Sequence, residues 1–99
     1  MKLPIRLRLE VTSDLSEAAD WYNAQRAGLG DEFVVAAFKA MDELAERPTW
    51  FPVVHKDVRR YLMDPYPYAI YFRSERSRVS ILGVIHTARS PRVWKRRSR

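Results

Sequence analysis

The spacing of apolar residues changes halfway along this 99-residue chain, and that change limits the folds open to it. Residues 15–44 carry apolar side chains at three- and four-residue intervals, which is typical of amphipathic helices. After Pro48 the apolar residues alternate with polar ones or form short runs, which is typical of strands. A helical block followed by a block of strands predicts an α+β fold. At this length the chain is expected to form one domain, residues 1–99.

A strand and a helix are predicted at the start of the chain. Apolar and charged residues alternate over residues 3–11, which predicts a strand with one buried face. Ser13 or Asp14 is then the predicted cap of a helix, because Glu17 follows Asp14 at the spacing of a capping box. This helix is expected to end near Ala27.

A second helix is predicted after the glycine-containing turn RAGLGDEF. Asp31 and Glu32 place negative charge in its first turn, where the helix dipole favours it. Its apolar stripe runs from Phe33 to Leu44 and stops before Pro48. Because the connection is so short, the two helices are expected to form an antiparallel hairpin.

In the second half, residues 51–55 and 58–62 are short strand-like pieces, and residues 66–73 and 78–86 are predicted strands. Pro52 excludes the first of them from the centre of a sheet, since proline cannot donate a ladder hydrogen bond. The predicted order is therefore β-α-α-β-β-β. It describes a two-layer α+β fold, with the helical hairpin packed on a small, mostly antiparallel sheet. Residues 87–99 have no evident place in the core and form a predicted basic C-terminal tail.

The charge is divided unevenly between the halves. Residues 1–49 have a net charge of −3 and residues 50–99 a net charge of +9. The basic half is expected to attract phosphate groups or an acidic protein surface. No cysteine and only two histidines are present, which excludes a disulfide and a thiol nucleophile and predicts no metal or cofactor. No apolar run is long enough for a signal peptide or a membrane span, so a cytoplasmic protein without membrane contact is expected.

Several phrases, taken in order, resemble the RelE/ParE superfamily of type II toxin-antitoxin toxins. They are the first strand, the hairpin segment WYNAQRAGLGDEF, the phrases FPVVHKDVRRYLM and YPYAIYF, and the ending VIHTARSPRVWKRR. The last two look most like the ParE-like or plasmid-stabilisation group. The resemblance covers nearly the whole chain and implies the same fold.

The resemblance implies a toxin that inhibits growth and is neutralised by a cognate antitoxin. ParE-type toxins poison DNA gyrase, whereas RelE-type toxins cleave messenger RNA on the ribosome. The ParE-type function is the favoured interpretation here, and the RelE-type function is the alternative. A third possibility is an inactive toxin-like binding module, which contacts DNA only through the antitoxin complex that regulates its own promoter.

An RNA-cleaving toxin requires an acid-base pair and cations that stabilise the phosphate. His86 suits proton transfer, since its unperturbed pKa lies near neutrality. Many RNA-cleaving relatives carry a tyrosine just after the last strand, where this chain has Thr87 and Ala88. The catalytic candidates for this alternative are His86, Arg73, Arg59 and Lys56, with Arg60 and Arg89 as further cations.

A gyrase poison requires a binding surface and no catalytic residue. A basic tail with Trp94 as an apolar anchor would supply that surface. The antitoxin is expected to lay an acidic or amphipathic segment over Arg59, Arg73 and His86 or over the tail. The predicted target-binding residues are Arg89, Arg92, Trp94, Lys95, Arg96 and Arg97, and the predicted antitoxin-binding residues are Arg60, Arg73 and Tyr71.

Structural roles explain several of these residues equally well. Trp94 can close one end of the core, with Pro91 turning the chain back onto the sheet. His86 can be an ordinary residue at a strand end. The terminal basic residues can act as a solubilising tail.

Overall fold

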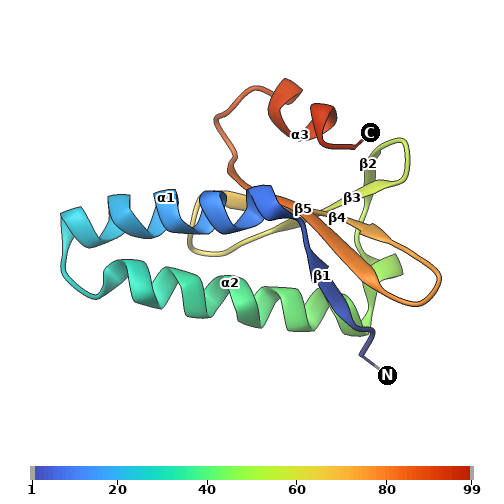
Figure 1. Cartoon of the computed structure of the whole chain (residues 1–99), viewed down its shortest axis with the longest axis horizontal. Helices are drawn as coiled ribbons and strands as arrows, with labels where there is room; N and C mark the ends of the chain where they lie inside the picture. Colours follow the sequence, from blue (N-terminus) through green and yellow to red (C-terminus); the bar gives the residue numbers. More distant parts are fainter. Residues whose placement is uncertain (1, 99) are drawn as a thin grey trace.

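A computed structural model describes residues 2–98 of the chain. The predicted succession of one strand, a helical hairpin and then strands is confirmed, but four strands follow the hairpin, one more than in the order β-α-α-β-β-β. The structure also adds a 3-10 turn, η1, and a C-terminal helix, α3 (Figure 1). The elements are β1 (Ile5–Leu7), α1 (Leu9–Gln25), α2 (Leu29–Glu46), η1 (Pro48–Trp50), β2 (Val53–His55), β3 (Val58–Leu62), β4 (Tyr68–Ser74), β5 (Val79–His86) and α3 (Arg92–Arg96). Within residues 2–98, no helix is long and apolar enough to cross a membrane.

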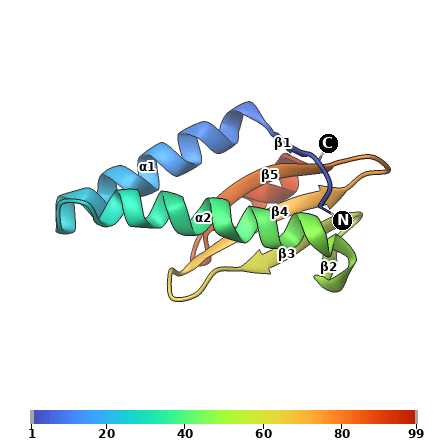
Figure 2. The ribbon, with the colours of Figure 1, turned by 90° about the horizontal axis from the view of Figure 1, so that it is seen from below.

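The five strands form one sheet in the order β1-β5-β4-β3-β2. β1 pairs with β5 in parallel, and the other neighbours are antiparallel. Between β1 at one edge and β2 at the other, the chain forms the α1–α2 hairpin, which covers one face of the sheet (Figure 2). β2 lies at the opposite edge, as Pro52 predicted. The mostly antiparallel two-layer arrangement is confirmed.

The main core lies between the hairpin and the sheet. Its largest fully buried side chains include Phe33, Met41 and Leu44 of α2 and Phe72 of β4. The two helices approach closely at Gly30, where an added Cβ would lie 2.1 Å from the Ala19 carbonyl oxygen. The hairpin can close only because this position has no side chain.

The first helix begins earlier than the sequence predicts. It starts at Leu9, so Ser13 and Asp14 lie inside α1 and do not cap it. The strand is correspondingly shorter than predicted, ending at Leu7. The capping-box prediction is wrong because the Asp14 carboxylate is used elsewhere, accepting a hydrogen bond from the Val84 amide at 2.9 Å.

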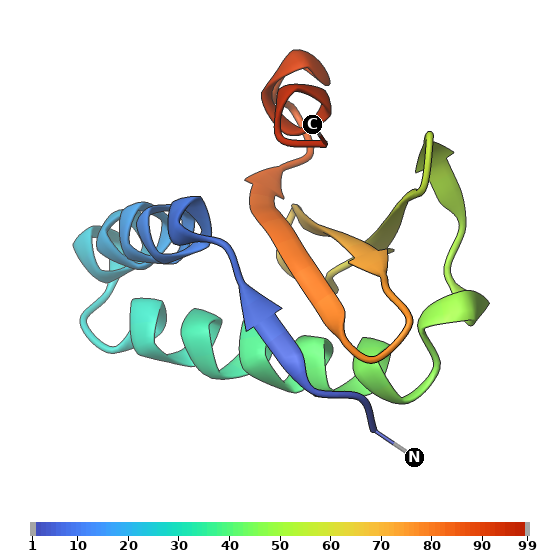
Figure 3. The same cartoon turned by 45° about the vertical axis from the view of Figure 1, so that its right-hand side comes forward.

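The predicted tail folds back onto the sheet. α3 lies on the face of the sheet opposite the α1–α2 hairpin (Figure 3). Trp94 is only 6% exposed and stacks on Tyr71 of β4, with ring centroids 4.4 Å apart and planes 12° apart. The two aromatic rings form a second, smaller core with Val58, Ala69, Leu82 and Ile85. The structural interpretation of Trp94 is therefore confirmed. Arg99, the last residue of the predicted tail, lies outside the described residues.

Candidate functional site

The position of α3 is fixed by an ion pair beside the open edge of β5. β1 pairs with β5 only from Val79 to Ile81, so the edge of β5 beyond that point has no neighbouring strand. The Arg97 guanidinium donates to the Leu82 carbonyl on this edge, and the Asp14 carboxylate accepts from the Val84 amide. Arg97 and Asp14 also bind each other, at 2.6 and 3.1 Å. Two side chains thus take the place of a missing strand.

The ion pair changes the acid-base behaviour of Arg97. The hydrogen bond that Arg97 donates to Asp14, more than the charge of Asp14, raises the pKa of Arg97 above its usual value, although burial acts in the opposite direction. Arg97 therefore stays charged at every physiological pH. Gly83 makes room for it, since a Cβ at that position would lie 2.8 Å from a guanidinium nitrogen.

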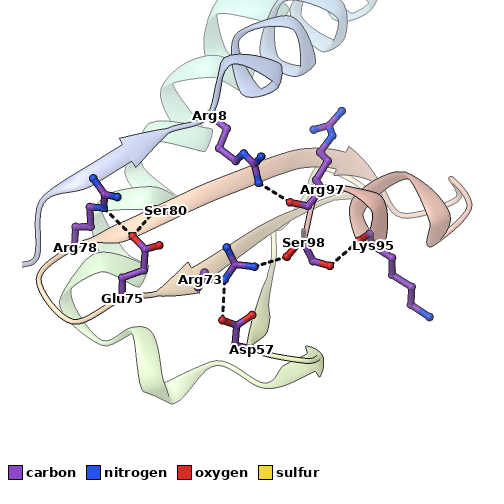
Figure 4. Close-up of polar contacts among 9 residues, drawn as sticks. All are labelled: Arg8, Asp57, Arg73, Glu75, Arg78, Ser80, Lys95, Arg97 and Ser98. Carbon is purple, nitrogen blue, oxygen red and sulfur yellow. Dashed lines mark hydrogen bonds and ion pairs between the residues drawn. The ribbon is translucent and has the colours of Figure 1, made fainter.

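Two further arginines hold the end of the chain against the sheet (Figure 4). Arg8 donates to the carbonyl of Arg97, and Arg73 donates to the carbonyl of Ser98 at 2.6 Å. The Arg73 Nε also lies 2.8 Å from an Asp57 carboxylate oxygen, in an ion pair that lacks hydrogen-bond alignment. Arg73 is therefore occupied on both sides by the chain itself.

Four further basic residues gather around a pocket beside α3. The pocket has a volume of about 300 Å³ and is lined by His55, Lys56, Arg92, Lys95 and Arg96. Lys56 reaches it from the β2–β3 turn, where its backbone adopts a left-handed conformation with a φ of 52°. Among the residues that the structure describes, none of these four Lys and Arg side chains is in an ion pair. This set, called the basic pocket below, is free to bind an anionic group.

His86 lies far from the basic pocket. It pairs with Tyr68 at one end of β4, whereas Arg73 pairs with Ser80 near the other end. Five residues of strand separate these pairs, a distance of roughly 17 Å. The His86 Nδ1 accepts a hydrogen bond from the Ala88 amide at 3.0 Å, so the neutral ring carries its proton on Nε2. In that state His86 can donate a hydrogen bond through Nε2, but neither ring nitrogen is free to accept one.

The predicted catalytic set is not brought together. Lys56 and Arg73 lie at the same end of the sheet, but His86 does not. Arg59 donates to the Phe51 carbonyl at 2.8 Å and so holds the loop before β2. The structure thus assigns Arg59 and Arg73 to supporting the fold. Arg89 is exposed in the turn after β5, away from the lining of the basic pocket.

Three of the predicted contact residues are internal. Tyr71 is 5% exposed and lies beneath Trp94, and burial raises the pKa of its phenol against the opposing effect of Arg60. Trp94 stacks on Tyr71, and Arg97 pairs with Asp14. The prediction that Tyr71, Trp94 and Arg97 form a contact surface is therefore corrected, because α3 packs on the sheet. Arg92, Lys95 and Arg96 are exposed, as that prediction requires, and Arg60 is half-buried.

Sequence reasoning missed the residues that position this site. Asp14 was interpreted as a helix cap, and Asp57, Arg8 and Ser98 were given no role. The one available signal was the isolation of Asp14 between apolar helix positions Val11, Leu15 and Ala18, which places it on the buried face. A carboxylate on that buried face requires a hydrogen-bonding or charged partner, and the sequence does not identify that partner.

Solved structures, unlike family models and curated proteins, include a chain similar to this one. No protein-family model matches this sequence, and no curated protein matches it either. A solved structure described as the chromosomal ParDE TA system from P. aeruginosa contains a similar chain, with a TM-score of 0.77 at 16% identity. The alignment covers 86% of this chain and 96% of that one.

This chain has a ParE-like fold. The fold expected from the sequence resemblance is therefore confirmed. The alignment reaches nearly the full length of the other chain, so the hairpin and the sheet of the ParE-like fold are both included.

Proposed function

We propose that this chain is the toxin of a type II toxin-antitoxin system that inhibits growth by binding and poisoning DNA gyrase. The observation that carries the proposal is the ParE-like fold, shared over 96% of a chain from a ParDE system. Such a toxin acts in the cytoplasm, needs no cofactor, and favours the retention of a plasmid that encodes it with its antitoxin. It is not itself an enzyme, because the trapped chemistry belongs to gyrase.

The basic pocket is the proposed contact with the target. Gyrase works on DNA, so the surface that a poison meets carries phosphate charge. Lys56, Arg92, Lys95 and Arg96 present four cations on one surface, none of them in an ion pair with another described residue. Such a surface accelerates association with a polyanionic partner and strengthens the complex at low salt. Because Trp94 is buried, its role in this proposal is to hold α3 in place.

The same surface is the proposed binding site of the antitoxin that neutralises the toxin. An acidic segment of the antitoxin that covers the basic pocket removes the cations from the target. Arg60, half-buried at the edge of this region, is a further contact for that segment. Contact with DNA is then made by the antitoxin in the complex.

The RelE-type alternative is less favoured by the geometry. An RNA-cleaving site needs its proton-transfer groups and cations around one phosphate. Here His86 is roughly 17 Å from Arg73 along the sheet. Arg73 and Arg59 are already bound to backbone carbonyls.

The proposal is tested with purified protein and gyrase in a supercoiling assay. The wild-type chain is expected to inhibit supercoiling and to trap cleaved DNA. The double variant Lys95→Glu/Arg96→Glu is expected to need at least about tenfold more protein, because two charges of the contact are reversed. The control Arg6→Glu/Arg76→Glu changes the net charge equally at exposed positions outside the pocket and is expected to resemble wild type.

Three outcomes would contradict the proposal. Equal loss in both double variants would mean that overall charge, and not the pocket, matters. Ribosome-dependent cleavage of messenger RNA with intact gyrase activity would establish the RelE-type alternative. Absence of growth arrest when the chain is expressed without antitoxin would favour the inactive binding module.

A further inference from the structure

A second pocket lies at the other end of the sheet, between α1 and the start of β4. It has a volume of about 370 Å³ and is lined by Trp21 and Tyr22 of α1, Pro67 and Tyr68 at the start of β4, and His86 of β5. No Lys, Arg, Asp or Glu is among its lining residues. We call it the aromatic pocket.

The walls of the aromatic pocket are held in place by the core. Tyr22 stacks on the fully buried Phe33, with ring centroids 5.3 Å apart, and Tyr68 meets Phe33 at 4.9 Å. His86 packs edge-on against Tyr68 at 5.2 Å. Trp21 is different, since 58% of this large residue is exposed. A rigid aromatic wall facing an exposed tryptophan is a preorganised site for one side chain of a partner.

The charges near this pocket favour a cation. Glu17 lies one turn before Trp21 on α1 and lines an adjoining hollow that shares Trp21, Tyr68 and His86 with the aromatic pocket. In the described part of the chain, Glu17 is in no ion pair. Residues 9–46, which form the helical hairpin, contain nine Asp and Glu but only two Lys and Arg. This face of the molecule therefore attracts positive charge, in contrast to the face that carries α3.

One cation opposes this trend. Arg89 lines the same adjoining hollow from the turn after β5. Burial raises the pKa of Tyr68, the charge of Arg89 opposes that rise and the charge of Glu17 adds to it, so both charges act on the Tyr68 phenol. Glu17 and Arg89 thus place opposite charges on either side of the aromatic pocket. Removing each charge in turn therefore tests whether the occupant is a cation.

We propose that the aromatic pocket binds an arginine or lysine side chain from a basic segment of a protein partner. The cation lies against the faces of Trp21 and Tyr68, which attract it through their π electrons, and pairs with Glu17 at the rim. The basic pocket on the other face is expected to bind an acidic segment. The two surfaces therefore bind segments of opposite charge. This inference does not depend on gyrase as the target.

The test uses the full chain and two capped peptides, Ac-AARAA-NH₂ and the same peptide with citrulline in place of arginine. The Trp21 indole N–H signal in an NMR spectrum of ¹⁵N-labelled protein is the readout, assigned with a Trp21→Phe variant. The arginine peptide is expected to shift this signal and the citrulline peptide to leave it unchanged. Glu17→Gln is expected to weaken binding about two- to fivefold, and Arg89→Gln to strengthen it by a similar factor.

Glu10→Gln is the matched control, because it removes the same charge from an exposed position two turns earlier on α1. It is expected to bind like wild type. Equal shifts with arginine and citrulline, or no shift at millimolar peptide, would overturn the proposal. So would the reverse response to the two rim variants, because Arg89 would then favour and Glu17 oppose binding of the arginine peptide. If Trp21→Phe inhibits gyrase as strongly as the wild-type chain does, the outcome of the peptide experiment says nothing against the proposed function.

Discussion

Asp14 and Arg97 lie 83 residues apart and form a two-point ion pair that closes the open edge of the central strand β5. Their side chains are 6% and 16% exposed, so the pair is largely removed from water. Removing one partner would leave the other charge buried without compensation. The pair therefore links the start of α1 to the end of α3.

Replacing Arg97 is expected to destabilise the protein and release α3. Arg97→Ala should lower the free energy of unfolding by about 3 kcal/mol, because Asp14 remains buried and charged. Urea unfolding measures the loss. Arg96→Ala, at the exposed neighbouring position, should change stability by less than about 0.5 kcal/mol. Similar losses in the two variants would contradict the assigned role of the pair.

Trp94 is expected to be the apolar anchor of α3. Trp94→Ala should cost about 3–5 kcal/mol, since it removes a large buried ring that stacks on Tyr71. The near-ultraviolet circular dichroism of the stacked pair should also disappear. Trp50→Ala is the control, because Trp50 is 73% exposed and its ring lies 4.5 Å from the Arg47 guanidinium. Its loss should stay below about 1 kcal/mol, and an equal effect at the two positions would refute the anchor.

Gly30 is expected to tolerate no side chain. Gly30→Ala places a Cβ 2.1 Å from the Ala19 carbonyl oxygen and 2.6 Å from the Asn23 amide nitrogen. The helices must separate, which should cost about 2–3 kcal/mol. Gly28→Ala provides the comparison, since it meets no atom within 4 Å and suffers only from the left-handed φ of 90°. A loss of about 1 kcal/mol is expected there, and a smaller loss at Gly30 than at Gly28 would contradict close helix packing.

Stability at high pH is expected to depend on Tyr61. Burial, followed by the hydrogen bond to Glu43, raises the pKa of Tyr61 from 10.0 to about 12. The folded state therefore binds the phenol proton more tightly than the unfolded state does. This contribution is complete below pH 10 and is lost as the pH rises to about 12. Urea unfolding between these pH values should show a shallower decline for Tyr61→Phe, and parallel curves for variant and wild type would disprove the effect.

His86 is expected to be dispensable for growth arrest. Its Nδ1 is bound by the Ala88 amide, and it lies far from the basic pocket, so His86→Gln should retain toxicity within about twofold when expressed without antitoxin. The growth rate after induction is the measurement. Complete loss of toxicity in a variant that remains folded would revive the RNA-cleaving alternative.

The order of secondary structure was available from the sequence because its signals are local. The change of apolar spacing after Leu44 located the hairpin and the strands, and Pro52 placed β2 at an edge. The start of α1 was not predictable in the same way. Asp14 has the sequence pattern of a helix cap, but its carboxylate accepts hydrogen bonds from Val84 and Arg97, which are distant in sequence.

The sequence by itself determined the alternation of helix and strand and the excess of positive charge in the second half, since both depend on neighbouring residues. Only the tertiary structure decided what each basic residue does. Arg73 and Arg97 are bound to backbone carbonyls and carboxylates, whereas Lys95 and Arg96 line the basic pocket beside Lys56 and form no ion pair within residues 2–98. The physical reason is that α3 packs on the sheet through Trp94 and Tyr71. That contact between distant residues turns some charges inward and leaves others exposed.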